Sequence, residues 1–381
     1  MSSSSTSTMI PTVVIIFLSL IFTTFATKQS SLYPFESIYQ FGDSLSDTGN
    51  RIRQVGAKSV YNISNLPYGM TYFHKPTGRF SNGLLVVDFV AKALNLPLLP
   101  PYLEKNVSFS HGVNFAVAGS TALDNAFFLE RNIIVPSTNI PLSHQITWFK
   151  EHLNSVSDDA NAPERKEMLK KALVIIGGYG GNDVNNAISH GWSLEEIRKD
   201  FVSFIVESIS NAVREAIHLG AAYIVVPGNL PEGCLPIMLT QFPSADVRDY
   251  DEQGCLRKYN EFVLFFNSHL QKAVESLKIE FPDAVILYFD YYQAFQSILH
   301  YGDFFGFDQN SKLKACCGVG GKHNYNEEHV CGSKGVEACQ NPAEFIHWDG
   351  IHLTQAAYSH ISDRLIHDVL PKVTSATLFE L

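Results

Sequence analysis

The sequence has little charge, and positive charge is the scarcer of the two signs. Only 17% of the 381 residues are Asp, Glu, Lys or Arg, and 28 Lys and Arg stand against 38 Asp and Glu, which gives a formal net charge of −10. The basic residues do not gather into a stripe. Nucleic acids and anionic membrane surfaces bind proteins largely through clustered Lys and Arg. The composition therefore argues against both kinds of partner.

Several motifs and boundaries are missing as well. The chain has no Gly-x-Ser-x-Gly, the pattern that carries the nucleophile in the α/β-hydrolase fold. Its glycine-rich segment, residues 177–185, contains neither of the phosphate-binding patterns Gly-x-Gly-x-x-Gly and Gly-Lys-Ser/Thr. No internal repeat and no interdomain linker divides the chain. With 45% hydrophobic residues it can bury a large core, which allows one large domain or two small ones. We favour a single domain over residues 27–381.

Long apolar runs are confined to the start of the chain. Residues 9–22 are predominantly apolar, and Thr24-Phe25-Ala26 follows with a small-x-small cleavage pattern, although the usual basic residues before the run are missing. We interpret residues 1–26 as a signal peptide. A membrane anchor is the alternative, but the run is short for a bilayer span and contains Pro11. The mature chain is expected to follow the secretory pathway without membrane insertion, to the extracellular space or the vacuole.

Cysteine is absent from the first half of the chain. The second half contains Cys234, Cys255, Cys316, Cys317, Cys331 and Cys339. An even number of cysteines in an oxidising compartment predicts disulfides. The neighbours Cys316 and Cys317 are expected to bond elsewhere, and Cys234 with Cys255 would close a separate loop. A zinc site is the alternative, which the adjacent Cys-Cys spacing disfavours.

Two glycosylation triplets lie in polar, loop-like surroundings. They are Asn62-Ile63-Ser64 and Asn106-Val107-Ser108. Such triplets also arise by chance, and the signal peptide is what favours their use. We therefore predict glycosylation at Asn62 and Asn106.

The order of apolar patterns predicts an α/β fold. Continuous runs rich in β-branched residues, typical of strands buried on both faces, occupy residues 38–41, 172–176, 222–226 and 284–289. Helical patterns occupy residues 84–94, 193–220 and 256–279 and a last stretch from about 354. Alternating strands and helices predict a parallel sheet with helices on both faces. Residues 302–345, rich in Gly, Asn and Cys, are expected to form a disulfide-tied excursion.

Ser44 is the first residue with a chemical role to explain. It follows the predicted strand 38–41 within Gly42-Asp43-Ser44-Leu45. The ends of parallel strands are where α/β sheets gather their ligands, and the preceding glycine lets backbone N–H groups approach a reacting oxygen. An ordinary Gly/Asp/Ser turn is the alternative, and Asp47 and Asn50 are expected in either case to hold the loop after Ser44. Serine is a weak nucleophile alone and requires a base.

Asp349 and His352 supply that base. They lie three residues apart in Trp348-Asp349-Gly350-Ile351-His352, so the carboxylate can orient the imidazole that takes the serine proton. The fold is therefore expected to bring Ser44 and His352 together. A catalytic metal held by His347, Asp349 and His352 is the alternative, but we find no convincing distant ligand to complete it.

Two further segments offer N–H groups for an oxyanion. Gly83 lies near the start of the helix predicted over 84–94, where free N–H groups point outward. Asn182 follows the strand 172–176 and offers a side-chain N–H. With the backbone N–H of Ser44, these groups would stabilise a tetrahedral intermediate. Ordinary helix and loop capping is the alternative for both.

These segments together resemble the sequence blocks of the plant GDSL esterase/lipases of the SGNH hydrolase superfamily, including the acetylajmalan esterase branch. The matching blocks are Gly42-Asp43-Ser44-Leu45, Arg79-Phe80-Ser81-Asn82-Gly83, Gly180-Gly181-Asn182-Asp183 and Asp349-Gly350-Ile351-His352. The resemblance covers essentially the whole mature chain. It implies a flavodoxin-like three-layer α/β/α sandwich. It also implies Ser44 as nucleophile, His352 as base, Asp349 as its partner, and Ser44, Gly83 and Asn182 as oxyanion donors.

The resemblance implies hydrolysis of a small-molecule carboxylic ester through an acyl-enzyme, without metal or cofactor. An acetyl or other short acyl group on a plant specialised metabolite is the expected substrate. Acyl transfer by the same intermediate, a lipase acting on longer chains and a non-catalytic binding protein are the alternatives. Many plant members carry Tyr and an aliphatic residue where this chain has Val184 and Tyr179. We expect both differences to alter the pocket wall.

Overall fold

A parallel sheet forms the centre of the fold. The structure is a computed structural model that describes residues 33–55, 62–135, 138–157, 159 and 162–373. The expected signal peptide, residues 1–26, lies outside the described residues. Five strands pair in parallel in the order β2-β1-β3-β4-β5, which is the flavodoxin-like order. Their bounds, in that order, are Gly112–Asn114, Ser37–Phe41, Ala172–Ile176, Tyr223–Pro227 and Val285–Phe289.

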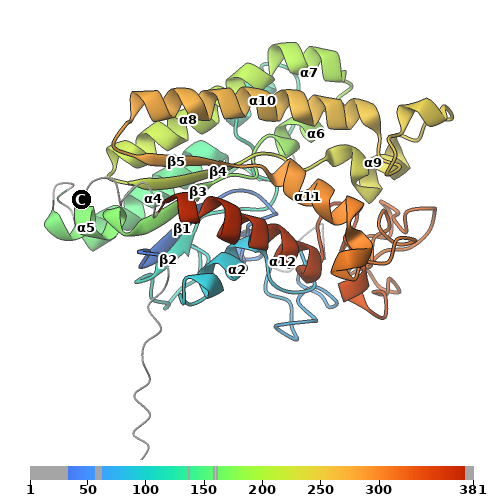
Figure 1. The fold of residues 1–381 in the computed structure, drawn as a ribbon, viewed down its shortest axis with the longest axis horizontal. Helices are drawn as coiled ribbons and strands as arrows, with labels where there is room; N and C mark the ends of the chain where they lie inside the picture. Colours follow the sequence, from blue (N-terminus) through green and yellow to red (C-terminus); the bar gives the residue numbers. More distant parts are fainter. Residues whose placement is uncertain (1–32, 56–61, 136–137, 158, 160–161, 374–381) are drawn as a thin grey trace, which may run out of the picture. The chain divides into compact units, whose positions relative to one another are not determined.

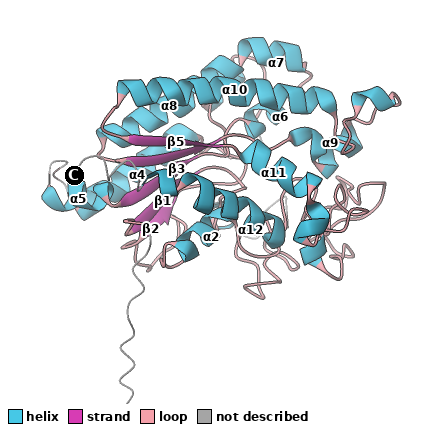
Figure 2. Ribbon diagram, viewed as in Figure 1, coloured by secondary structure: helices cyan, strands magenta, loops and turns pink. Residues whose placement is uncertain are grey.

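Helices cover both faces of the sheet, because alternate strand residues point to opposite sides (Figures 1 and 2). In β1, Tyr39 and Phe41 enter one apolar core and Ile38 enters the other. The first core is covered by α3 (Asn125–Leu129), α4 (Leu142–Val156), α5 (Pro163–Lys170), α6 (Gly181–Ser189), α7 (Leu194–Asp200), α8 (Val202–His218) and α10 (Arg257–Glu280). The second is covered by α2 (Val86–Ala93), α9 (Pro236–Gln241), α11 (Tyr291–His300) and α12 (Gln355–Arg364). The three-layer α/β/α sandwich is thus confirmed, and α1 (Asn50–Val55) lies beyond the end of β1.

Several elements differ from the sequence expectation. Among the described helices, the ones without a counterpart in the prediction are α1, α3, α4, α5, α6, α9 and α11. The helix expected over residues 193–220 begins at the predicted capping box but is two helices, α7 and α8, which meet at Phe201. The backbone leaves helical geometry there (φ −124°, ψ −43°), while the Phe201 ring packs against Phe127 and Trp192. Strand β2 has no counterpart in the prediction. Its three residues are too few to show a strand pattern, and within the described part of the chain it pairs with the single strand β1.

The excursion over residues 302–345 is tied by two disulfides. Cys316 bonds Cys339 and Cys317 bonds Cys331, so the adjacent cysteines do bond elsewhere. A third disulfide, Cys234–Cys255, closes the separate loop expected from the sequence. These bonds suit an extracellular protein. No helix among the described residues is long and apolar enough to cross a bilayer.

Candidate active site

Ser44 lies half-buried in the turn that follows β1. The backbone N–H groups of Ser46 and Asp47 donate to the Asp43 carbonyl oxygen at 3.1 and 3.0 Å and close the turn. The buried Asp47 carboxylate accepts four backbone N–H groups, including that of Ala118 beyond β2. The sequence correctly assigned Asp47 to holding this loop. Ser44 is therefore fixed at the carboxyl edge of the sheet.

Asp349 and His352 form a directly bonded, buried pair in the loop before α12. His352 Nδ1 lies 2.9 Å from Asp349 Oδ2 and 3.0 Å from Oδ1. The backbone N–H groups of Ile351 and His352 donate to Oδ1 at 2.8 Å, and the Tyr68 hydroxyl donates to Oδ2 at 2.9 Å. Burial alone would raise the pKa of Asp349, but the His352 ring and the backbone N–H groups of His352 and Ile351 hold that pKa at about 2. The ionised carboxylate keeps a proton on Nδ1 and leaves Nε2 as the basic nitrogen.

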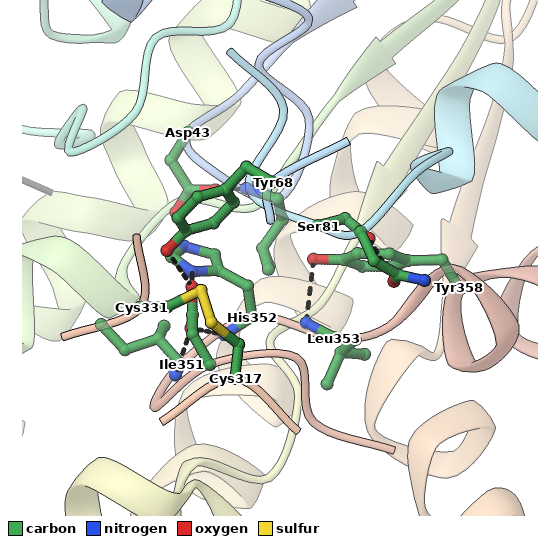
Figure 3. A network of polar contacts seen from close by, with 12 residues as sticks. Asp43, Tyr68, Ser81, Cys317, Cys331, Ile351, His352, Leu353 and Tyr358 are labelled. Atoms are coloured by element: carbon green, nitrogen blue, oxygen red, sulfur yellow. Dashed lines mark hydrogen bonds and ion pairs between the residues drawn. A yellow bond between two sulfur atoms is a disulfide. The ribbon is translucent and has the colours of Figure 1, made fainter. Parts of the chain in front are cut away.

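The basic nitrogen of His352 is available for chemistry. Nε2 is buried and has no hydrogen-bond partner within the described part of the chain. The ring packs on Phe80 with 4.5 Å between ring centroids. In Figure 3 the side chains of Asp43, Tyr68 and His352 gather beside the Cys317–Cys331 disulfide. His352 thus reaches the segment that carries Ser44, although Nε2 does not yet bond its hydroxyl. Such bonds are often long in a free enzyme and tighten when substrate binds.

Asn182 reaches the same turn from the start of α6. Its side-chain Nδ2 donates to Asp43 Oδ2 and to the Ser120 carbonyl oxygen, both at 3.0 Å. Both amide N–H groups are therefore engaged in this structure. Stabilising an oxyanion requires Asn182 to exchange one of these acceptors for the oxyanion.

Gly83 lies in the loop before α2, which begins only at Val86. Its N–H makes a single long bond of 3.3 Å to Ser81 Oγ, which an oxyanion can displace. A Cβ at this position would lie 1.9 Å from Gln355 Oε1, so a larger residue would have to displace the Gln355 side chain. That oxygen also accepts the Leu84 N–H at 3.0 Å, which ties this loop to α12.

Two cavities flank the site and share Ile351. The smaller, of about 50 Å³, is lined by Ser44 and Asn182. The larger, of about 310 Å³, is lined by Asp349 and His352 together with aromatic side chains such as Tyr68. An ester with its carbonyl carbon at Ser44 and its leaving oxygen at His352 would therefore lie across both cavities.

The described residues offer no set of ligands for the alternative of a catalytic metal site. No group of three or more His, Cys, Asp or Glu side chains suited to a metal occurs among the described residues. Burial lowers the pKa of His347 to about 3, and its ring packs 5.7 Å from that of Phe295. His347 therefore belongs to the core beneath the loop.

A family model and individual relatives place the chain among known proteins. Residues 38–365 match the GDSL-like Lipase/Acylhydrolase family. The chain belongs to the GDSL lipase/acylhydrolase family. Acetylajmalan esterase 1 of Rauvolfia serpentina is 47% identical over 347 residues, which are 91% of this chain and 90% of the relative. Sinapine esterase of Brassica napus is 40% identical over 344 residues, 90% of this chain and 88% of the relative. The family and its esterases make this protein a carboxylic ester hydrolase.

The resemblance led to one wrong expectation about this GDSL enzyme. Tyr179 and Val184 were expected to alter the pocket wall, but both are buried and line neither cavity. The Tyr179 hydroxyl donates at 2.7 Å to Oε1 of Gln145, whose Nε2 in turn donates to the Gly42 carbonyl oxygen at 2.8 Å. Tyr179 therefore supports the Ser44 turn from the core.

Sequence reasoning missed two side chains of the GDSL site. Tyr68 bonds Asp349 from a segment 281 residues away, and no local pattern marks it. Glu232 lines the smaller cavity beside Ser44. A signal for Glu232 did exist, because it follows β4 as Ser44 follows β1 and Asn182 follows β3, at the same edge of the sheet.

Buried carboxyl groups surround the Ser44 turn of the GDSL enzyme. Burial raises the pKa of Asp43 to about 7, against the opposing effects of the Leu45 N–H and His352. Burial also raises the pKa of Asp183 to about 6. Burial, and then the charge on Asp43, raise the pKa of Glu232 to about 8. Each group therefore binds its proton more tightly in the folded chain than in the unfolded one.

The raised pKa of Glu232 predicts a pH-dependent stability. Its stabilising effect is complete below its ordinary pKa of 4.5 and is lost as pH rises through about 8. We expect the Tm of wild type to fall as the pH rises from about 6.5 to 9. The Tm of Glu232→Gln should fall by about 3 °C less over the same range. Calorimetry across this range measures the difference. Glu195→Gln removes a charge from an exposed position and should follow wild type; parallel wild-type and Glu232→Gln curves would contradict the prediction.

Proposed function

We propose that this chain is a secreted serine esterase that works through an acyl-enzyme. Ser44 is the nucleophile, His352 the base and Asp349 the group that orients it. The backbone N–H groups of Ser44 and Gly83 and the side chain of Asn182 bind the oxyanion. The observation that carries the proposal is the buried Asp349–His352 pair, whose Nε2 has no hydrogen-bond partner among the described residues and whose ring interacts electrostatically with Asp43, the neighbour of Ser44.

The reaction follows from these positions. Ser44 Oγ attacks the ester carbonyl carbon while His352 Nε2 takes the hydroxyl proton. Collapse of the tetrahedral intermediate breaks the bond to the alcohol, which leaves with the proton from His352. Water then loses a proton to His352 and attacks the acyl-enzyme, which releases the acid and restores Ser44. Because His352 protonates the leaving oxygen, the alcohol occupies the 310 Å³ cavity and the acyl group the 50 Å³ cavity.

The preferred substrate is an acetyl or similarly short ester of a plant specialised metabolite. One water occupies about 10–15 Å³ of cavity space, so the 50 Å³ beside Ser44 holds an acyl group of few atoms. Relatives named for acetylajmalan and sinapine support a plant metabolite as the alcohol or acid component.

The rest of the proposal concerns processing. Residues 1–26 are a signal peptide, residues 27–381 are a single catalytic domain, and the protein acts outside the cell. Three disulfides support an extracellular location. Asn106 is exposed and open to glycosylation, whereas the Asn62 side-chain Nδ2 donates to Ser333 Oγ at 3.0 Å and would be glycosylated before that bond forms.

Acyl chain length tests the substrate assignment. We expect kcat/KM for p-nitrophenyl acetate to exceed that for the palmitate by more than about tenfold, because the small cavity rejects added methylene groups. Rates are compared on the disulfide-bonded protein without residues 1–26. A preference for palmitate would instead indicate a lipase. If an added alcohol gave mostly a new ester rather than acetic acid, the enzyme would be an acyltransferase.

A further inference from the structure

Glu232 carries a buried carboxyl that forms no hydrogen bond with the described residues. The residue is only 7% exposed. It lines the same 50 Å³ cavity as Ser44. Burying an unpaired carboxyl is unfavourable, so a protein that keeps one at a cavity wall indicates a ligand group that pairs with it.

The backbone around Glu232 is rigidly held. The Cys234–Cys255 disulfide closes this loop, and the Gly233 N–H donates to Asn260 Oδ1 on α10 at 2.9 Å. A few residues on, the Ile237 N–H donates at 2.9 Å to the carbonyl oxygen of Gly350, within the Asp349–His352 loop. The backbone that carries the Glu232 side chain is therefore fixed relative to both halves of the active site.

The Glu232 carboxyl packs at the start of α6. A Cβ on Gly181 would lie 3.0 Å from Glu232 Oε1, so the carboxyl lies close to the residue before Asn182. The side chains of Asn185 and Asn229 line the same cavity. One part of the cavity is therefore polar, while Leu230, Leu235 and Ile351 supply apolar lining. A plain alkyl group would leave the carboxyl unpaired.

We propose that Glu232 is a specificity-determining residue that selects short acyl groups bearing a hydroxyl over plain alkanoyl groups of the same size. This inference rests on the proposed function, which places the acyl group in the Ser44 cavity. Since the pKa of Glu232 is raised to about 8 by burial and by Asp43, the free carboxyl is largely protonated at neutral pH. It can then both donate to and accept from a substrate hydroxyl. A site built for such a bond discriminates strongly against a substrate that lacks it.

Phenyl glycolate and phenyl propionate test the inference, because their acyl groups differ by a hydroxyl in place of a methyl. The quantity measured is the ratio of their kcat/KM values. We expect Glu232→Leu to lower the glycolate-to-propionate ratio by about tenfold or more. Glu232→Gln, whose amide also donates and accepts, should keep most of the preference. Glu327→Gln, in the larger cavity, is the control and should leave the ratio unchanged.

A wild-type comparison keeps the test independent of the variants. For wild type, the ratio of kcat/KM for phenyl glycolate to kcat/KM for phenyl propionate is measured. It should be about tenfold larger than the ratio of the rates at which the same two esters hydrolyse in alkali without enzyme. If the enzymatic ratio in wild type equalled the ratio of the alkaline hydrolysis rates, the role of Glu232 would be overturned. The same conclusion would follow if folded Glu232→Leu turned over both esters at unchanged or equally reduced rates. Turnover of phenyl propionate that persists in Ser44→Ala would instead overturn the proposed function.

Discussion

Replacing Ser44 by alanine is expected to lower kcat for p-nitrophenyl acetate by about 10⁴-fold or more. The hydroxyl lies in the turn after β1, beside the cavity assigned to the acyl group. Without it no acyl-enzyme forms, and only binding and oxyanion stabilisation remain. Steady-state release of p-nitrophenol measures the loss, and an unchanged Tm shows that the fold survives.

Ser46 provides the matched control for this prediction. It lies two residues away in the same turn, is also half-buried, and its hydroxyl accepts a hydrogen bond from Gln40 Nε2 at 3.2 Å. Ser46→Ala should therefore leave kcat within about threefold of wild type, since one neutral hydrogen bond contributes little to the reaction. If Ser46→Ala were inactive and Ser44→Ala active, the assignment of Ser44 as the nucleophile would be wrong.

Replacing Asp349 by asparagine should lower kcat by about 10⁴-fold with little change in structure. Oδ1 would keep the backbone N–H groups of Ile351 and His352. The new amide, however, donates toward Nδ1, which drives the His352 proton to Nε2 and removes the base. The carboxylate charge that stabilises the imidazolium is lost as well. The rate is measured between about pH 6 and 10, where wild-type Asp349, whose pKa is held at about 2, stays ionised.

The variant Tyr68→Phe tests whether the charge of Asp349 or only its position matters for catalysis. Tyr68→Phe removes one hydrogen bond to Asp349 Oδ2 but leaves the carboxylate and its bond to His352. We expect a loss of about tenfold, the effect of one hydrogen bond to a charged group. A loss in Tyr68→Phe as large as in Asp349→Asn would show that position, and not charge, explains the importance of Asp349.

Local patterns in the sequence were sufficient for four of the five strands and for the segments that form α2, α7, α8, α10 and α12, but not for the other helices. β3 begins and ends at the predicted residues, and β4 is shifted by a single residue. Strands buried on both faces leave uninterrupted apolar runs, so this part of the fold is visible in sequence. The break at Phe201 and the short strand β2 depend on tertiary packing, which no local pattern records.

The parts of the candidate site that lie in short sequence motifs could be predicted, because the chemistry requires particular residue types at fixed spacings. Asp349 and His352 are bonded, and Ser44 lies in the turn after β1, as the motifs indicate. The side chains of Tyr68 and Glu232 reach the site through long-range contacts, and the bonds that occupy Asn182 depend on where Ser120 lies. Three-dimensional packing sets these features, so the sequence alone does not reveal them.

Direct detection of the acyl-enzyme tests the central claim. Wild type would be mixed with p-nitrophenyl acetate, quenched in acid during turnover and digested, and the peptides examined by mass spectrometry. The proposed mechanism predicts a single acetyl group on Ser44 that is absent from Ser44→Ala and disappears when the ester is exhausted. Turnover without any acetylated Ser44, or a transient acetyl group on another residue, would contradict it.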